Sequence, residues 1–145
     1  MKNNIILLFI ALSTLTGFAQ KKITWEDLAD IRYEEKYFPD YDEYFLYPYF
    51  SDSVKALEGQ KVTITGFFLD MDPNGELFVL SKTPFASCFF CGKSGPETAI
   101  ELQFPSKPQF QMDDLIAVTG ILKLNKDDVE HFNYILTDCS AVFDH

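Results

Sequence analysis

The chain has 145 residues, of which 47% are hydrophobic, 22 are acidic, 12 are basic and three are cysteines. That apolar content is sufficient for one packed core, while the length is too short for two ordinary domains. A net charge of −10 argues against nucleic-acid binding, which needs positive charge, and three cysteines are too few for a dense disulfide scaffold.

The first nineteen residues have the pattern of a secretory signal peptide. Lys2 supplies positive charge, Ile5–Leu12 is an apolar run, and Gly17 and Ala19 are small residues at the −3 and −1 positions of a cut after Ala19. The run is too short for a transmembrane helix, which needs about 20 apolar residues. We therefore expect an exported chain, periplasmic or secreted, that begins at Gln20. The alternative is that the segment forms a hydrophobic core strand.

The exported chain should begin with a short helix. Thr24 is a typical N-cap residue, and Glu26 and Asp27 place acids in the first turn, where exposed N–H groups favour negative charge. Trp25 and Leu28 follow at helical spacing, so one face of the helix can dock on a core.

Residues 33–50 form a strongly aromatic segment, in which nine of eighteen residues are aromatic and five are acidic. The interleaved acids would repel phosphate, which again argues against nucleic acid. Two interpretations stay open. The segment is either a strap that covers one opening of the domain and buries its rings, or a rim that stacks on a carbohydrate or an uncharged organic ligand. Tyr41, Tyr44 and Tyr47 are the candidate ligand-binding residues. Residues 51–57 then predict a helical turn closed by Gly59.

From Gln60 onward, alternating apolar and polar residues predict strands. The expected strands are 62–69, 77–80, 100–104, 115–124 and 132–137, with a hairpin turn at residues 72–75. No helical stretch between them is long enough to connect parallel strands, so we expect five antiparallel strands in up-and-down order.

A Thr-Gly pair recurs in the middle of the first and fourth expected strands, at Gly66 and Gly120. A glycine weakens a strand unless the strand bends sharply or another backbone approaches it. Two long bent strands among five are typical of a small OB-type barrel, although the similarity of two apolar strands can also arise by chance. The predicted fold is mainly β: a five-stranded antiparallel OB-like barrel with a short N-terminal helix and an aromatic strap. Residues 20–58 hold the helix and strap, and residues 59–145 hold the barrel, together as one domain.

The most specific local motif is Cys88-Phe89-Phe90-Cys91-Gly92. Two thiols at this spacing can close a disulfide, act as a redox pair, or bind one metal such as zinc or copper. Export makes a Cys88–Cys91 disulfide the leading interpretation, with metal binding and a reduced structural pair as alternatives, and no cofactor is expected. In an up-and-down barrel Cys139 would follow the fifth strand, far from this motif, so we expect it to be a core thiol.

Catalysis has little support in the sequence. The histidines are His131, beside a turn, and His145, the last residue, and neither a nucleophile elbow nor a phosphate loop is present. The leading interpretation is an exported, non-enzymatic binding or interaction module, whose partner can be a protein, a glycan or a small molecule. The alternative is a thiol-redox or metal-binding protein centred on Cys88 and Cys91.

Three segments carry a resemblance to a known group of proteins: residues 57–67, the Cys motif with Ser87 before it, and Gly95-Pro96-Glu97-Thr98. The chain resembles a family of uncharacterised exported bacterial proteins over Trp25 to Phe143. The resemblance implies an OB-like barrel and an exported location, and it implies no activity.

Overall fold

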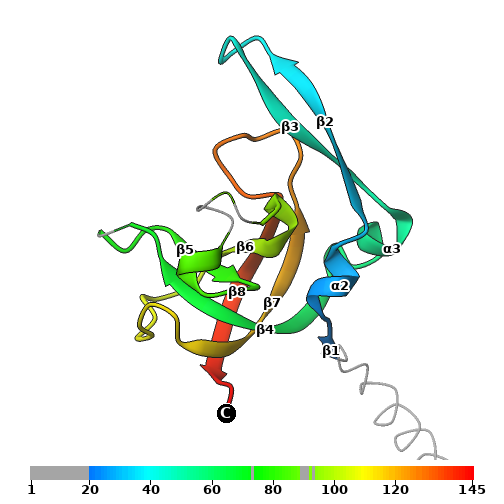
Figure 1. The fold of residues 1–145 in the computed structure, drawn as a ribbon. Helices are drawn as coiled ribbons and strands as arrows, with labels where there is room; N and C mark the ends of the chain where they lie inside the picture. Colours follow the sequence, from blue (N-terminus) through cyan, green and yellow to red (C-terminus); the bar gives the residue numbers. More distant parts are fainter. Residues whose placement is uncertain (1–19, 73, 89–91, 93) are drawn as a thin grey trace, which may run out of the picture.

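The computed structural model describes residues 20–72, 74–88, 92 and 94–145, and these form a barrel with a β-hairpin that rises from one end (Figure 1). The signal-peptide prediction lies outside the described residues. In chain order the elements are β1 (Lys21–Lys22), α2 (Trp25–Leu28), β2 (Ile31–Phe38), β3 (Glu43–Phe50), α3 (Asp52–Lys55), β4 (Lys61–Asp70), β5 (Phe78–Ser81), the 3-10 turns Phe85–Ser87 and Pro96–Thr98, β6 (Ala99–Leu102), β7 (Leu115–Leu124) and β8 (Tyr134–Phe143).

Five strands close the barrel in the order β4-β5-β6-β8-β7, and β7 pairs back to β4. The predicted five-stranded barrel is confirmed, but the expected wholly antiparallel, up-and-down order is wrong. Four barrel pairings are antiparallel, whereas β6 and β8 are parallel, with Glu101 opposite Ile135. The reason is topological, because directions cannot alternate all the way round a closed ring of five strands. A non-sequential strand order is a feature of Greek-key barrels, the class that includes the OB fold.

Gly66 and Gly120 lie inside β4 and β7, as the repeated Thr-Gly pair predicts. A Cβ atom on Gly66 would lie 2.7 Å from the carbonyl oxygen of Ser81 and 2.9 Å from Cγ of Leu80. One on Gly120 would lie 2.8 Å from the carbonyl oxygen of Thr137, where the register of β7 and β8 shifts. Both glycines therefore stand where a neighbouring backbone approaches closely, which is the condition that favours glycine inside a strand.

The predicted N-terminal helix is a single turn, α2, that two hydrogen bonds attach to the barrel. Thr24 occupies the N-cap position. The indole of Trp25 donates to the carbonyl oxygen of Thr65 at 2.8 Å, and the hydroxyl of Tyr134 donates to the carbonyl oxygen of Leu28 at 2.7 Å. Among the described residues, no helix is long and apolar enough to cross a bilayer.

Hydrophobic side chains fill the barrel, and a second, smaller cluster covers the outside of its wall. Leu80 of β5 belongs to the main core, whereas its strand neighbour Val79 packs with Leu69, Ala99 and Cys88 in the second cluster. Successive residues of a strand point to opposite faces. Cys88 therefore lies against the outer face of the barrel, and both faces of β5 and β6 are buried.

The last strand, β8, begins two residues later and extends six residues further than the expected 132–137. Cys139 consequently lies inside β8, which corrects its expected position after the last strand. The left-handed φ of 51° at Asp138 interrupts the alternation of side chains, so the sequence pattern ended the strand too early. Cys139 is buried in the main core, as predicted, and burial raises its pKa to about 11.

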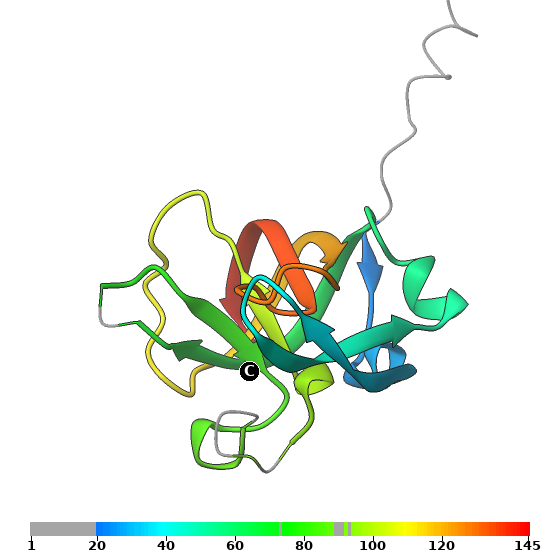
Figure 2. The same cartoon turned by 90° about the horizontal axis from the view of Figure 1, so that it is seen from above.

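Residues 33–50 belong to an antiparallel hairpin of β2 and β3 that runs from the Ile31–Phe50 pair to the Phe38–Glu43 pair. Its base is buried, and the Phe50 ring lies 5.6 Å from that of Tyr134. Its outer half passes over the loop that joins β7 to β8 (Figures 1 and 2). The expected strap with buried rings is wrong for this outer half, because these strands extend beyond the barrel core. The Tyr44 side chain, for example, is 69% exposed.

Candidate functional site

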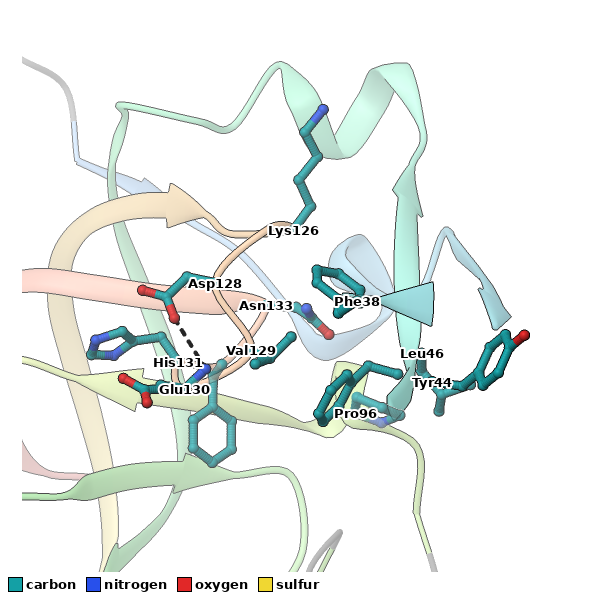
Figure 3. A pocket seen from close by; sticks show the side chains of 12 residues that line it. Phe38, Tyr44, Leu46, Pro96, Lys126, Asp128, Val129, Glu130, His131 and Asn133 are labelled. Carbon is teal, nitrogen blue, oxygen red and sulfur yellow. Dashed lines mark hydrogen bonds between the residues drawn. The ribbon is translucent and has the colours of Figure 1, made fainter. Parts of the chain in front are cut away.

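A cleft of about 400 Å³ separates the outer half of β3 from the β7–β8 loop, residues 125–133 (Figure 3). We call it the hairpin cleft. Apolar and aromatic side chains line much of it, and charged side chains of the loop stand at its rim. Its lining residues are Phe38, Tyr44, Phe45, Leu46, Pro96, Lys126, Asp128, Val129, Glu130, His131, Phe132 and Asn133.

The three tyrosines predicted to bind a ligand occupy different positions around this cleft. Tyr44 lines its outer margin, and its ring points away from the loop (Figure 3). Tyr41, in the hairpin turn, packs edge-on against Phe45 with ring centroids 5.7 Å apart. Tyr47 instead lines a second, smaller depression of about 340 Å³ nearer the barrel. The structure thus places Tyr41 and Tyr44 beside one concavity and Tyr47 beside another.

Contacts between rings and cations give the hairpin a defined shape. Phe38 meets Phe45 edge-on at 5.6 Å, and Tyr37 lies 5.2 Å from Tyr44 across the two strands. The ammonium of Lys36 lies 4.0 Å from the ring centroid of Tyr47. Cross-strand aromatic pairs and cation–π contacts stabilise a two-stranded sheet that would otherwise be only marginally stable.

Two polar contacts join the hairpin to the β7–β8 loop. The hydroxyl of Tyr47 donates to a carboxylate oxygen of Asp127 at 3.1 Å, and the ammonium of Lys36 lies 4.0 Å from the same oxygen. Asn125 holds the loop itself, because its side-chain amide donates to the carbonyl oxygens of Asp128, His131 and Phe132 at 2.7 to 3.1 Å. Both walls of the hairpin cleft are therefore fixed before any ligand arrives.

A histidine–carboxylate pair fastens the loop to the barrel wall. Nδ1 of His131 lies 2.9 Å from both carboxylate oxygens of Glu101, which is buried on the outer face of β6. The same carboxylate accepts hydrogen bonds from the Gln103 side chain at 3.1 Å and from the Phe132 backbone at 3.3 Å. The hydrogen bond to Glu101 and the charge of that group raise the pKa of His131.

The mouth of the cleft is acidic. Asp128 and Glu130 stand on the loop, and Asp40 stands on the hairpin turn opposite. Desolvation of the Tyr41 hydroxyl raises its pKa, and the negative charges of Glu130, Asp128 and Asp40 raise it further. These acids therefore surround the tip of the hairpin, where they favour a neutral or positively charged ligand over an anionic one.

Cys88, the first residue of the cysteine motif, lies apart from the main core. Cys88 is fully buried in the cluster on the outer barrel wall, and Gly92 has a left-handed φ of 70°, as expected for a tight turn after the motif. Cys91 lies outside the described residues, so the disulfide and the zinc or copper site stay predictions. Within the part of the chain that is described, no three His, Cys, Asp or Glu side chains are grouped as metal ligands.

Sequence reasoning missed several residues of the site. Glu101 alternates with apolar neighbours in β6 and was therefore indistinguishable from a surface residue, although the loops above it bury its carboxylate. His131 had one weak signal, its place between a turn and an apolar strand. Phe45 shared only the general aromatic signal of residues 33–50, and Leu46 and Val129 carried no signal, because the cleft exists only when hairpin and loop meet.

Comparison of the sequence with protein-family models and with curated proteins finds no match. Among solved structures, the chain is similar to the crystal structure of a DUF3299 family protein from Pseudomonas aeruginosa PAO1. The two are 14% identical with a TM-score of 0.57, over 88% of this chain and 97% of that one. At this identity the likeness shows the fold alone. It agrees with the resemblance to uncharacterised bacterial proteins in that coarse sense, whereas export and the family's Cys motif stay predictions.

Proposed function

We propose that this protein is an exported, non-enzymatic binding module that holds its ligand in the hairpin cleft. One observation carries the proposal: apolar side chains of the hairpin remain in water beside a concavity whose walls are already fixed. Leu46, which lines the cleft, is 53% exposed, and the half-buried rings of Phe38 and Phe45 line it as well. Burying such side chains contributes about 1.5–3 kcal/mol each, and exposed apolar groups that gather at a concave site are typical of ligand-binding surfaces.

The arrangement of the cleft also supports binding over catalysis. His131, which is the histidine in the lining, is engaged through Nδ1 with Glu101. The other polar side chains that the loop contributes to the lining are Lys126, Asp128, Glu130 and Asn133, and the described residues of the cleft include no nucleophile paired to a base. The two acids outnumber the one lysine, so the net charge of these side chains is negative and favours a neutral or cationic ligand.

Nuclear magnetic resonance of the ¹⁵N-labelled chain tests this function with three probes: cellotetraose, a peptide of alternating valine and lysine, and one of alternating valine and glutamate. We expect cellotetraose or the basic peptide to shift the backbone amides of residues 38–46 and 126–133. The acidic peptide should leave them unchanged. Shifts that map to the opposite end of the barrel, or no shift with any probe, would contradict the proposed site.

A matched pair of variants controls this experiment. Val129→Trp places a large ring in the cleft, whereas Val142→Trp places the same ring on β8 at a site where valine is 67% exposed. We expect the first substitution to abolish the shifts and the second to preserve them. Equal effects of the two would show that binding does not depend on the hairpin cleft.

For the cysteine motif we propose a structural disulfide between Cys88 and Cys91 in the exported chain. The burial of Cys88 supports a structural role, because a nucleophilic thiol has to be accessible. Native mass spectrometry of protein prepared without added metal or reductant should give the mass of the chain less two hydrogens. A stoichiometric zinc or copper that is lost in Cys88→Ser would instead establish the metal-binding alternative.

A further inference from the structure

We propose that the hairpin cleft receives an extended segment of a partner polypeptide, which adds as a third strand to the open edge of β3 and carries lysine or arginine side chains. This inference rests on the proposed function and deepens it, because it names the chemistry of the ligand and the atoms that recognise it. Strand addition of this kind uses backbone hydrogen bonds for affinity and the side chains of alternate residues for specificity.

The first support is the direction of backbone groups along β3. Hydrogen-bonded and non-hydrogen-bonded residue pairs alternate in an antiparallel sheet. The Ser51 amide donates to the carbonyl oxygen of Asp30 at 3.2 Å, so this pair is hydrogen-bonded. The Glu35–Leu46 pair lies an odd number of pairs away from the Asp30–Ser51 pair. It is therefore a non-hydrogen-bonded pair, and the backbone of Leu46 is not bonded to β2. The N–H and C=O groups of Leu46 and Tyr44 consequently point away from β2.

The outward N–H and C=O groups of Tyr44 and Leu46 lie on the edge of β3 that is opposite β2. In the described part of the chain, β2 and β3 form a sheet of two strands only. Pro48 lies on the same edge nearer the barrel, where it offers no N–H. The donors and acceptors available to a partner are therefore concentrated at Tyr44 and Leu46, in the outer half of the hairpin.

The second support is that the cleft lies along this same edge. Tyr44, Phe45 and Leu46 line one side of it, and Val129 and Pro96 line the other. Neighbouring strands lie about 4.8 Å apart, packed sheets lie about 10 Å apart, and a strand rises about 3.3 Å per residue. The product of these lengths gives a volume of roughly 160 Å³ for one residue of an added strand. A cleft of about 400 Å³ therefore holds two to three residues of a partner, which suits the two open positions of β3.

The third support is charge. Residues 31–50 contain five acids and two bases, and residues 125–133 contain three acids and one lysine. Both bases of the hairpin are already engaged, since Arg32 lies 4.9 Å over the Tyr49 ring and Lys36 lies 4.0 Å over the Tyr47 ring. Asp128 and Glu130 stay at the rim of the cleft. Lysine or arginine on alternate residues of an added strand would meet these carboxylates, whereas acidic residues would be repelled.

Leu46→Pro isolates the backbone contribution. A proline at residue 46 removes the outward N–H and leaves the β2–β3 hydrogen bonds intact, because this position is not bonded to β2. Leu46→Ala removes the same side chain and keeps the N–H, so it is the matched control. The probe is an acetylated, amidated seven-residue peptide of alternating valine and lysine, and its affinity is measured by the amide shifts of residues 38–46 and 126–133.

We expect Leu46→Pro to weaken binding of the probe at least about tenfold relative to Leu46→Ala, which corresponds to the loss of one backbone hydrogen bond. Methylation of alternate amide nitrogens of the probe should weaken its binding to the unaltered chain similarly. This second measurement decides the matter if Leu46→Pro does not fold, as judged by circular dichroism. The amide of Leu46 should also become protected from hydrogen exchange when the probe is bound.

Four results would overturn strand addition. If the probe binds in the cleft but is insensitive to Leu46→Pro and to methylation, or if only cellotetraose binds there, the cleft keeps its proposed function without strand addition. If no probe reaches the cleft, both proposals fail. If light scattering shows a dimer that Leu46→Pro dissociates, the edge of β3 is occupied by a second copy of the chain instead.

Discussion

Replacing His131 with alanine tests whether the β7–β8 loop is anchored through the buried carboxylate of Glu101. The substitution removes the charge-assisted hydrogen bond between Nδ1 and that carboxylate, at 2.9 Å. A hydrogen bond to a charged group contributes about 1.5–3 kcal/mol, but the His131 side chain is 46% exposed and solvent screens the interaction. We therefore expect a loss of about 1 kcal/mol in the free energy of unfolding, or roughly 0.7 M in the urea midpoint.

The loss should depend on pH with a defined sign. Glu101 raises the pKa of His131 in the folded protein above its ordinary value of 6.5. A group of this kind stabilises the fold fully below its unfolded pKa, and the contribution is lost as pH rises through the folded pKa. Urea unfolding at about pH 5.5 and at about pH 8.5 should thus show a larger effect of His131→Ala at the lower pH.

Two controls accompany this measurement. His145→Ala removes the other histidine and should change the stability by less than about 0.5 kcal/mol at either pH. In a Glu101→Gln background, His131→Ala should lose its pH dependence, because the charged acceptor is gone. Equal destabilisation by His131→Ala at both pH values in the unaltered background would refute the reasoning.

The remaining predictions concern the barrel. Gly66→Ala should lower the free energy of unfolding by about 1–3 kcal/mol in urea titrations, because its Cβ would lie 2.7 Å from the carbonyl oxygen of Ser81; an unchanged midpoint would show that β4 and β5 can separate without cost. Tyr134→Phe should cost about 1–2 kcal/mol by leaving the buried carbonyl oxygen of Leu28 without its donor, which the same titration measures against the unaltered chain. Cys139, buried and with its pKa raised to about 11, should react with iodoacetamide only in denaturant, as peptide mapping by mass spectrometry would reveal. Labelling of Cys139 at neutral pH in the folded protein would contradict its place in the core.

The sequence predicted the barrel because local signals agreed with its long-range structure. Thr-Gly pairs marked Gly66 and Gly120 as the places where backbones approach, and strand β7 matched its predicted range. The parallel pairing of β6 with β8 was not predicted, since alternation of side chains carries no information on which strand is the neighbour. A closed ring of five strands nevertheless requires one such pair, so strand count alone could have corrected the expectation.

The candidate site was harder to predict because it is formed by segments far apart in the chain. The aromatic composition of residues 33–50 indicated a ligand surface as one of two interpretations, and Tyr41 and Tyr44 do stand beside the hairpin cleft. The opposite wall is supplied by residues some eighty positions later, and it is held there by Glu101, whose burial no local pattern indicates. The aromatic composition therefore predicted the hairpin side of the cleft and could not predict the loop side.

The contacts that stabilise the hairpin are also the ones that leave its outer edge available. An isolated two-stranded hairpin is marginally stable, so this one needs support from the rest of the molecule. Phe50 packs on Tyr134 at the base, and Tyr47 and Lys36 reach Asp127 farther out. All of these contacts are made by side chains, and none consumes the outward backbone groups of β3 at residues 44 and 46. The hairpin is thus stabilised while, among the residues that the structure describes, the outer edge of β3 stays unpaired. Less conformational entropy is therefore lost when a partner strand binds to this edge.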